Sequence, residues 1–266
     1  MGTKFHSFIV VTIKVILVIA FFFKGHAFAE DNLVQWFASG NSAYEQGNYQ
    51  KAADYYQKIV EAGGISGGIY YNLGNSYFRL GKLGHAIFYY KKALMYIPAN
   101  ADLRFNLDYV SARAVDKITE NVVNTKSLLL KVNSWVPVSL QQGLYFFAAL
   151  SILFWGMLSI ALWRWSWLRN IAYVCAFLWV LVGGVCALKT YANSVDWGVV
   201  TAKSANVYSA TGKDNVILFT LHEGSEFEIM EKLRINEINW FQIELKDGKR
   251  GWIKQLEVIT NTGSGY

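Results

Sequence analysis

Apolar and polar residues follow three different patterns in successive parts of the chain. Residues 30–115 carry small and aromatic residues at helical spacing, whereas 144–163 and 168–188 are almost free of charge. Residues 196–259 alternate apolar and polar side chains with a period of two, which is the spacing of a strand. The sequence therefore predicts a multidomain protein with an all-α part, a hairpin of two apolar helices and an all-β part.

The all-α part contains an internal repeat with an offset of 34 residues. Gly40-Asn41-Ser42 recurs as Gly74-Asn75-Ser76, and Tyr55-Tyr56 recurs as Tyr89-Tyr90. The second copy has the tetratricopeptide spacing of small and large residues, carried by Tyr70, Leu73, Gly74, Tyr77, Ala86, Tyr90 and Pro98. Two unrelated helical hairpins are the alternative, but eight matched positions at one offset argue against it. We interpret residues 30–115 as a tetratricopeptide array that ends in a capping helix from Ala101 to Val115.

The two apolar ranges have the length of transmembrane helices. Each of 144–163 and 168–188 has about 20 residues, enough to cross the hydrocarbon core of a bilayer. A buried helical hairpin of a soluble protein is the alternative, but the soluble segments look too small to bury it. Arg164 and Arg169 make the short connection basic, which favours the cytoplasmic side. We therefore predict a transmembrane hairpin whose partner is the lipid bilayer.

Residues 1–29 have the three parts of a secretory signal peptide. Lys4 precedes an apolar stretch, and Ala27-Phe28-Ala29 is a small-residue cleavage site. An uncleaved anchor helix is the alternative reading. In both cases the segments on either side of the hairpin, including the repeats, are expected outside the cytoplasm.

The all-β part is expected to form a small closed or nearly closed barrel over residues 196–259. Glu223-Gly224 and Asp247-Gly248 mark turns between its short strands. Residues 116–143 are a membrane-proximal connector, and 260–266 are expected to be a disordered tail.

Charge and chemistry exclude several classes of function. The formal charge of the whole chain is +6, and loss of Lys4, Lys14 and Lys24 with the signal peptide leaves +3, too little to predict nucleic-acid binding. The two histidines outside that peptide, His85 and His222, fall in different domains, so we expect no metal site and no cofactor. A phosphate-binding loop is also absent from the sequence. We therefore expect a protein that is not an enzyme.

Protein binding is the function that the repeats predict. The first helices of a tetratricopeptide array line its concave face, and aromatic and amide side chains there suit an extended peptide. The repeat register places on that face Phe37, Asn41, Tyr44, Tyr71, Asn75, Phe78, Arg79, Phe105 and Tyr109. In the all-β part, Tyr208, Trp240 and Trp252 are a possible ligand platform, with structural packing as the alternative.

Two resemblances extend this prediction. Leu221-His222-Glu223-Gly224, Asn239-Trp240-Phe241 and Gly251-Trp252-Ile253 resemble the bacterial Src-homology-3-like (SH3-like) domains, which implies an SH3-like barrel. The order of signal peptide, repeats, membrane hairpin and barrel resembles the BatE family of the bacterial aerotolerance operon. That resemblance implies a scaffold in the bacterial inner membrane, with both soluble domains in the periplasm. The partners it implies are von Willebrand-type membrane proteins and a MoxR-type ATPase. A cell-wall anchor that holds peptidoglycan and recruits its enzymes is the alternative.

Overall fold

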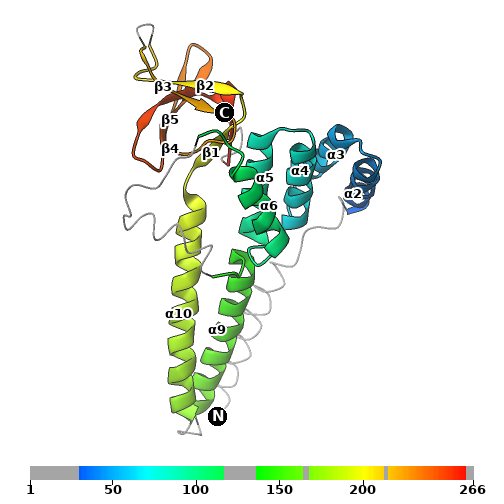
Figure 1. The fold of residues 1–266 in the computed structure, drawn as a ribbon. Helices are drawn as coiled ribbons and strands as arrows, with labels where there is room; N and C mark the ends of the chain where they lie inside the picture. The colour runs from blue at the N-terminus through cyan, green and yellow to red at the C-terminus, as the bar shows by residue number, and fades with distance from the viewer. Residues whose placement is uncertain (1–29, 117–135, 164–167, 213–214, 262–266) are drawn as a thin grey trace.

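A computed structural model describes residues 30–116, 136–163, 168–212 and 215–261. The predicted signal peptide, most of the predicted connector and residues 262–266 of the predicted tail lie outside these ranges. The described part contains a row of helices, a pair of long helices and an antiparallel sheet (Figure 1).

The row of helices consists of antiparallel pairs followed by one further helix. The helices are α2 (Glu30–Glu45), α3 (Tyr49–Glu61), α4 (Gly67–Arg79), α5 (Leu83–Tyr96) and α6 (Ala101–Ser111). Side chains cap two of them, because Ser66 Oγ accepts from Ile69 N at 3.2 Å and Asn100 Oδ1 accepts from Leu103 N at 2.8 Å. The last helix, α6, is the predicted capping helix. It begins at Ala101, as expected, but ends at Ser111 and not at Val115.

Glycine allows the two helices of each pair to approach closely. A Cβ atom at Gly40 would lie 2.7 Å from the ring of Tyr56, and one at Gly74 would lie 2.4 Å from the ring of Tyr90. Both tyrosines are almost fully buried. The same small–large pair thus packs the first and the second repeat, which accounts for the offset of 34 residues seen in the sequence.

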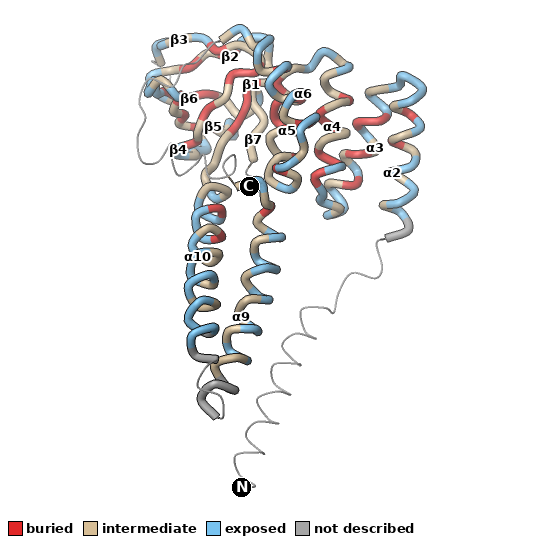
Figure 2. The backbone as a smooth tube through the Cα atoms, turned by 60° about the horizontal axis from the view of Figure 1, so that its bottom comes forward, coloured by how far each residue is buried: buried red, intermediate tan, exposed pale blue. Residues whose placement is uncertain are grey.

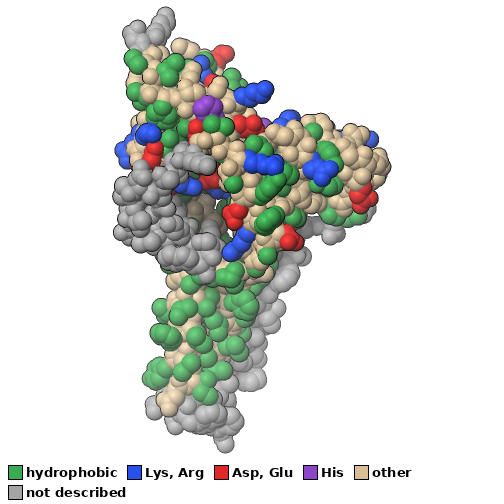
Figure 3. Space-filling view, in the orientation of Figure 1, with side chains coloured by type: hydrophobic (Ala, Val, Ile, Leu, Met, Phe, Trp, Pro, Cys, Tyr) green, Lys and Arg blue, Asp and Glu red, His purple; other side chains and the backbone are tan. Residues whose placement is uncertain are grey.

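Two long helices project from the rest of the molecule. They are α9 (Leu140–Trp163) and α10 (Leu168–Ser194), which lie side by side and expose apolar side chains along their length (Figures 2 and 3). Both are long and apolar enough to cross a membrane, over Leu140–Leu158 and Tyr173–Ser194. Between them, Trp179 Nε1 donates to Ser151 Oγ at 2.6 Å, and the ring of Phe147 stacks on that of Trp179.

The sheet has seven strands within the described residues, and all its strand pairs are antiparallel. The strands are β1 (Trp197–Val200), β2 (Ser204–Tyr208), β3 (Ile217–His222), β4 (Glu226–Ile235), β5 (Ile238–Glu244), β6 (Arg250–Lys254) and β7 (Val258–Thr260). Their order is β3-β2-β6-β5-β4-β1-β7, with a short helix, η1 (Gln255–Glu257), before the last strand. This corrects the expectation of a closed barrel, because among the described strands β3 pairs with β2 alone and β7 pairs with β1 alone.

One expectation about this sheet is corrected, and one turn was not predicted. Thr260 and Asn261, which the sequence assigned to the tail, belong to the sheet region: Thr260 pairs with Gly198, and Asn261 Oδ1 accepts from Trp197 N at 2.8 Å. The turn between β4 and β5 is formed by Asn236 and Glu237, both with positive φ. The sequence reading missed it because no glycine marks it.

Helix α5 packs against β1 and β7, so the repeats and the sheet lie side by side (Figures 1 and 2). The ring centroids of Phe88 and Trp197 are 5.2 Å apart, and Lys91 Nζ lies 2.7 Å from Glu226 Oε2. The backbone N–H of Gly84 donates to Glu223 Oε1 at 3.0 Å. One side of the helical row is therefore used to hold the sheet.

Candidate functional site

The candidate site is the surface made by α2, α4 and α6, the first helix of each unit, which we call the first-helix face. It carries the nine residues that the repeat register predicts for binding. In the described ranges, none of the nine takes part in the hydrogen bonds, ion pairs or ring contacts that join the repeats to the sheet. The structure therefore leaves this face available while the opposite helix, α5, is covered.

A hydrogen bond recurs at the same place in both repeats. The hydroxyl of Tyr56 donates to Asn41 Oδ1 at 2.8 Å, and the hydroxyl of Tyr90 donates to Asn75 Oδ1 at 2.8 Å. Each bond links the second helix of a repeat to an asparagine on its first helix. Because the side-chain oxygens accept from the tyrosines, the side-chain NH2 groups of Asn41 and Asn75 remain as donors for a ligand.

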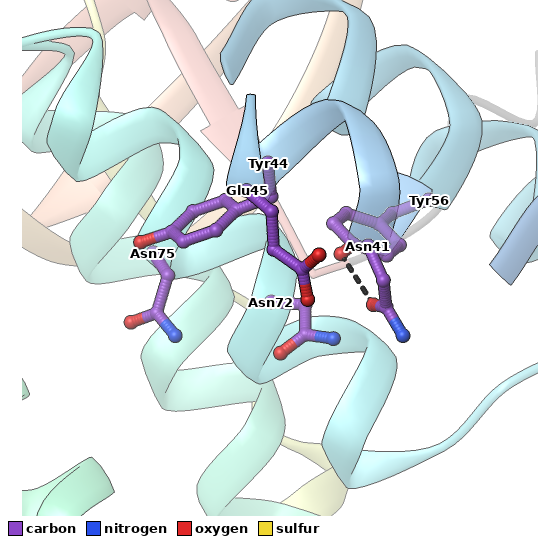
Figure 4. A pocket seen from close by; sticks show the side chains of 6 residues that line it. All are labelled: Asn41, Tyr44, Glu45, Tyr56, Asn72 and Asn75. Carbon is purple, nitrogen blue, oxygen red and sulfur yellow. Dashed lines mark hydrogen bonds between the residues drawn. The ribbon is translucent and has the colours of Figure 1, made fainter. Parts of the chain in front are cut away.

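A pocket of about 120 Å³ lies between α2, α3 and α4 (Figure 4). Its lining is polar and aromatic, and consists of Asn41, Tyr44, Glu45, Tyr56, Asn72 and Asn75. Burial raises the pKa of Tyr56 to about 12, and burial, partly offset by Arg79, also raises the pKa of Tyr44. Both tyrosines are therefore neutral at physiological pH, and Glu45 supplies the only acidic group of the lining.

The face continues from α4 to α6 through a second polar link. Asn106 Nδ2 donates to the hydroxyl of Tyr71 at 3.0 Å and approaches Asn75 Oδ1 at 3.4 Å. Asn106 was not among the predicted residues, although the repeat register places it on the same helix as Phe105 and Tyr109. Tyr71 is thus held in place by a hydrogen bond as well as by its ring contact with Tyr90, at a centroid distance of 6.0 Å.

Aromatic rings form an exposed strip at the α6 end of the face. Phe78 and Tyr109 meet edge to face at 5.9 Å, and Tyr109 stacks on Phe105 at 6.3 Å. Phe105 is 69% exposed and Tyr109 is 44% exposed, which is high for such large rings. The guanidinium of Arg113 lies 4.3 Å from the centroid of Tyr109. This strip is an apolar surface rimmed by a cation, of the kind that anchors a peptide side chain.

The remaining two predicted residues lie at the edges of the face. Phe37 is 39% exposed, with its ring centroid 6.3 Å from that of Tyr56. The Arg79 guanidinium lies 4.7 Å from the ring centroid of Tyr49 and also donates to the hydroxyl of Tyr49. The structure thus brings seven of the nine residues into the pocket, the Asn106 link and the aromatic strip, and places Phe37 and Arg79 beside them.

The covered side of the repeats is held by partly buried charged groups. Burial alone would raise the pKa of Glu226, but the charges and hydrogen bonds of Lys91 and Lys246 outweigh it and hold the pKa at about 2. Nearby, Asp116 accepts hydrogen bonds from His222 N at 2.7 Å and from Ser225 Oγ at 2.5 Å. Burial opposes ionisation of Asp116, but these bonds and His222 lower its pKa overall. The sequence reading missed this interface.

The possible ligand platform on the sheet is largely packed. Trp240 is only 5% exposed, and its ring meets that of Tyr208 edge to face at 5.6 Å. Lys254 Nζ lies 5.5 Å from the centroid of Trp240 and 5.7 Å from that of Tyr208. Trp252, half-buried, lies on the neighbouring strand, opposite Tyr208 in the register. These contacts make Trp240 a packing residue and leave only Tyr208 and Trp252 partly open to solvent.

One cluster in the described part of the chain brings an aspartate, a histidine and a serine together. No group of three or more His, Cys, Asp or Glu side chains there is arranged to hold a metal ion. Ser225 Oγ has a single proton, which is shared between Asp116 Oδ2 at 2.5 Å and the backbone oxygen of His222 at 2.7 Å, so the hydroxyl is fixed within this cluster. The geometry of this cluster is that of a structural anchor.

Comparison with known proteins agrees with the repeat packing. The tetratricopeptide repeat family model matches residues 69–100, which cover most of α4 and all of α5. No curated protein matches the chain. Repeats of this kind mediate contacts between proteins. The helical part of the chain therefore contains a tetratricopeptide repeat, a module for binding other proteins.

Proposed function

We propose that this protein is a non-enzymatic scaffold whose first-helix face binds an extended segment of a partner protein. The observation that supports this most directly is that one side of the repeats contacts the sheet and the other side does not. Helix α5 is fixed to the sheet by Phe88, Lys91 and Gly84, while the first-helix face keeps exposed rings and free amide donors. Because α5 is fixed to the sheet, the repeats are held rigidly while the first-helix face stays exposed.

The exposed side chains of this face match the chemistry of a peptide. Amide NH2 groups on Asn41 and Asn75 can donate to backbone carbonyls of an extended chain. The rings of Phe78, Phe105 and Tyr109 can anchor an apolar or aromatic side chain, the type of contact that dominates many interfaces. Binding requires little rearrangement, because the tyrosines and Asn106 already hold the asparagines in place.

The hairpin α9–α10 anchors this platform in the bacterial inner membrane, with the repeats and the sheet in the periplasm. Length, apolar composition and the exposed apolar surface of both helices support insertion in a membrane, and the predicted signal peptide with the basic connection that contains Arg164 and Arg169 supports the periplasmic side. A reporter enzyme that is active only in the periplasm should be active when fused after Tyr266 and inactive when fused after Ser166. The reverse pattern would place the repeats in the cytoplasm and refute the location.

The resemblance to the BatE family names the partners to test. They are the von Willebrand-type membrane proteins and the MoxR-type ATPase of the aerotolerance operon, and the sheet would be an SH3-like module of the same scaffold. Pulldown from bacterial membranes with the full chain should recover the membrane proteins. Phe78→Ala/Phe105→Ala should reduce that recovery strongly, because it removes one exposed ring, Phe105, and one partly buried ring, Phe78, from the aromatic strip.

Ile65→Ala is the matched control, because Ile65 is an exposed apolar residue in the loop between α3 and α4, outside the first-helix face. It should leave recovery unchanged. Equal recovery by the double variant and the wild type would refute binding by this face. Sedimentation of the chain with purified peptidoglycan, in place of recovered proteins, would favour the cell-wall anchor instead.

A further inference from the structure

The pocket between α2 and α4 holds a carboxylate that the fold does not neutralise. Glu45 is the last residue of α2, and the last turn of that helix has no basic residue. The carbonyl groups at a helix C-terminus carry partial negative charge, so a cation beside the Glu45 carboxylate is favoured, and Glu45 is exposed and can reach one from a ligand. In the described part of the chain, no ion pair includes Glu45.

The groups around Glu45 do not supply that cation. The pocket lining consists otherwise of two neutral tyrosines and three asparagines. Figure 4 shows the carboxylate of Glu45 above the side chain of Asn72 and beside that of Asn41. The cation that acts on Tyr44 is Arg79, but its guanidinium stacks on Tyr49 and is not part of the lining. The pocket therefore offers one negative charge, from Glu45, beside the side-chain amides of three asparagines.

We infer that this pocket binds a lysine or arginine side chain of the partner segment, and that Glu45 is the residue that selects it. This inference rests on the proposed function of the first-helix face. A lysine ammonium has three donors and an arginine guanidinium has five, and neither has an acceptor. Such a group can donate to the Glu45 carboxylate and to the side-chain oxygen of Asn72 at once.

The neighbouring amides add a second part to the recognition. The oxygens of Asn41 and Asn75 already accept from tyrosines, so their NH2 groups face a ligand as donors. These donors fit backbone carbonyls on either side of the basic residue. A free carboxylate in this pocket would instead meet Glu45 and the helix terminus, both negative. The site thus prefers an internal basic residue over a peptide C-terminus.

A selection experiment tests this directly. The full chain in lipid nanodiscs is exposed to a displayed library of random dodecapeptides, and bound sequences are read after several rounds. Wild type should enrich one position for Lys or Arg. Glu45→Gln should lose that enrichment, and Glu45→Lys should replace it with Asp or Glu. Glu61→Gln is the matched control, since Glu61 is an exposed glutamate at the end of α3 outside the pocket, and it should behave as wild type.

Binding measurements with a synthetic peptide from the selection give the size of the effect on affinity. Replacing its basic residue by norleucine should weaken binding to wild type about two- to fivefold, the range for an ion pair with an exposed carboxylate. The same replacement should change binding to Glu45→Gln by less than about twofold. Peptides that depend on Phe78 but show no basic position would overturn this inference and leave the proposed function intact. Failure of wild type to enrich any sequence over the Phe78→Ala/Phe105→Ala variant would overturn both.

Discussion

The α-carbon of Gly84 lies so close to Val200 that a Cβ atom there would be 2.2 Å from the Val200 carbonyl oxygen. This approach lets the N–H of Gly84 reach Glu223 and brings the rest of α5 against β1. The first repeat has Gln50 at the corresponding position, 34 residues earlier, and does not contact the sheet through it. The second repeat is therefore specialised to hold the sheet, which leaves the first-helix face free for binding.

Gly84→Ala should loosen this junction. The added methyl group must displace backbone atoms of Val200, so we expect a loss of about 1–3 kcal/mol in the free energy of unfolding. Amide hydrogen exchange in α5 and β1 should become faster. Gly68→Ala, near the start of α4, is the control: the nearest atom to its Cβ is 4.0 Å away, so stability should stay the same or rise slightly. Equal effects of the two substitutions would contradict the close approach.

Acid should destabilise the repeats through His85. Burial, with a smaller effect of Lys82, lowers the pKa of His85 to about 4, and its Nδ1 has no hydrogen-bond partner within the described part of the chain. The unfolded chain has a histidine pKa of about 6.5, so the folded state favours the neutral ring. This contribution to stability is complete above about pH 6.5 and disappears as the pH falls to about 4, a loss of at most about 3 kcal/mol.

Thermal unfolding between pH 8 and pH 4 measures this loss. His85→Phe keeps a ring beside Tyr77 but cannot take up a proton, so its melting temperature should depend less on pH over that range. Below about pH 4.5 both proteins should lose further stability, because the Glu226 carboxyl takes up a proton in the unfolded chain but stays ionised in the folded state, where its pKa is about 2. A wild-type profile that is flat between pH 6.5 and pH 4 would refute the burial of a neutral His85.

Two adjacent glycines of α10 should respond differently to the same substitution. A Cβ atom at Gly183 would lie 2.9 Å from the ring of Phe147 on α9, whereas one at Gly184 has no neighbour within 4 Å. Helices in a membrane associate through close packing, so Gly183→Leu should weaken the α9–α10 contact and lower the melting temperature in detergent. Gly184→Leu should leave it nearly unchanged. The opposite order would place α9 on the other side of α10.

The parts of the fold that the sequence predicted are those with a periodic or compositional signature. Gly40 with Tyr56 and Gly74 with Tyr90 repeat one packing solution, so their spacing is visible without coordinates. Helices α9 and α10 follow from apolar length alone, although they extend to Leu140 and Ser194 beyond the predicted ranges.

The order of the strands and the docking of the sheet on α5 could not be predicted in this way. They depend on contacts between distant residues, such as Lys91 with Glu226, which leave no periodic pattern. The sequence predicted which residues lie on the first-helix face, but the contacts that each of them makes could be seen only in the structure. The sequence could not show that Trp240 is buried, that Asn106 joins α6 to Asn75, or that Glu45 forms no ion pair with another described residue.

The central claim is that the first-helix face contacts a partner protein, and site-specific photo-crosslinking in living cells tests it most directly. A photoreactive phenylalanine analogue is placed at Phe105 on this face, and at two exposed apolar control positions, Ile65 and Ile217 on strand β3. We predict a crosslinked protein from position 105 that is absent from both controls and lost with Phe78→Ala. Crosslinks from position 217 alone, with none from position 105, would contradict the account and assign partner binding to the sheet.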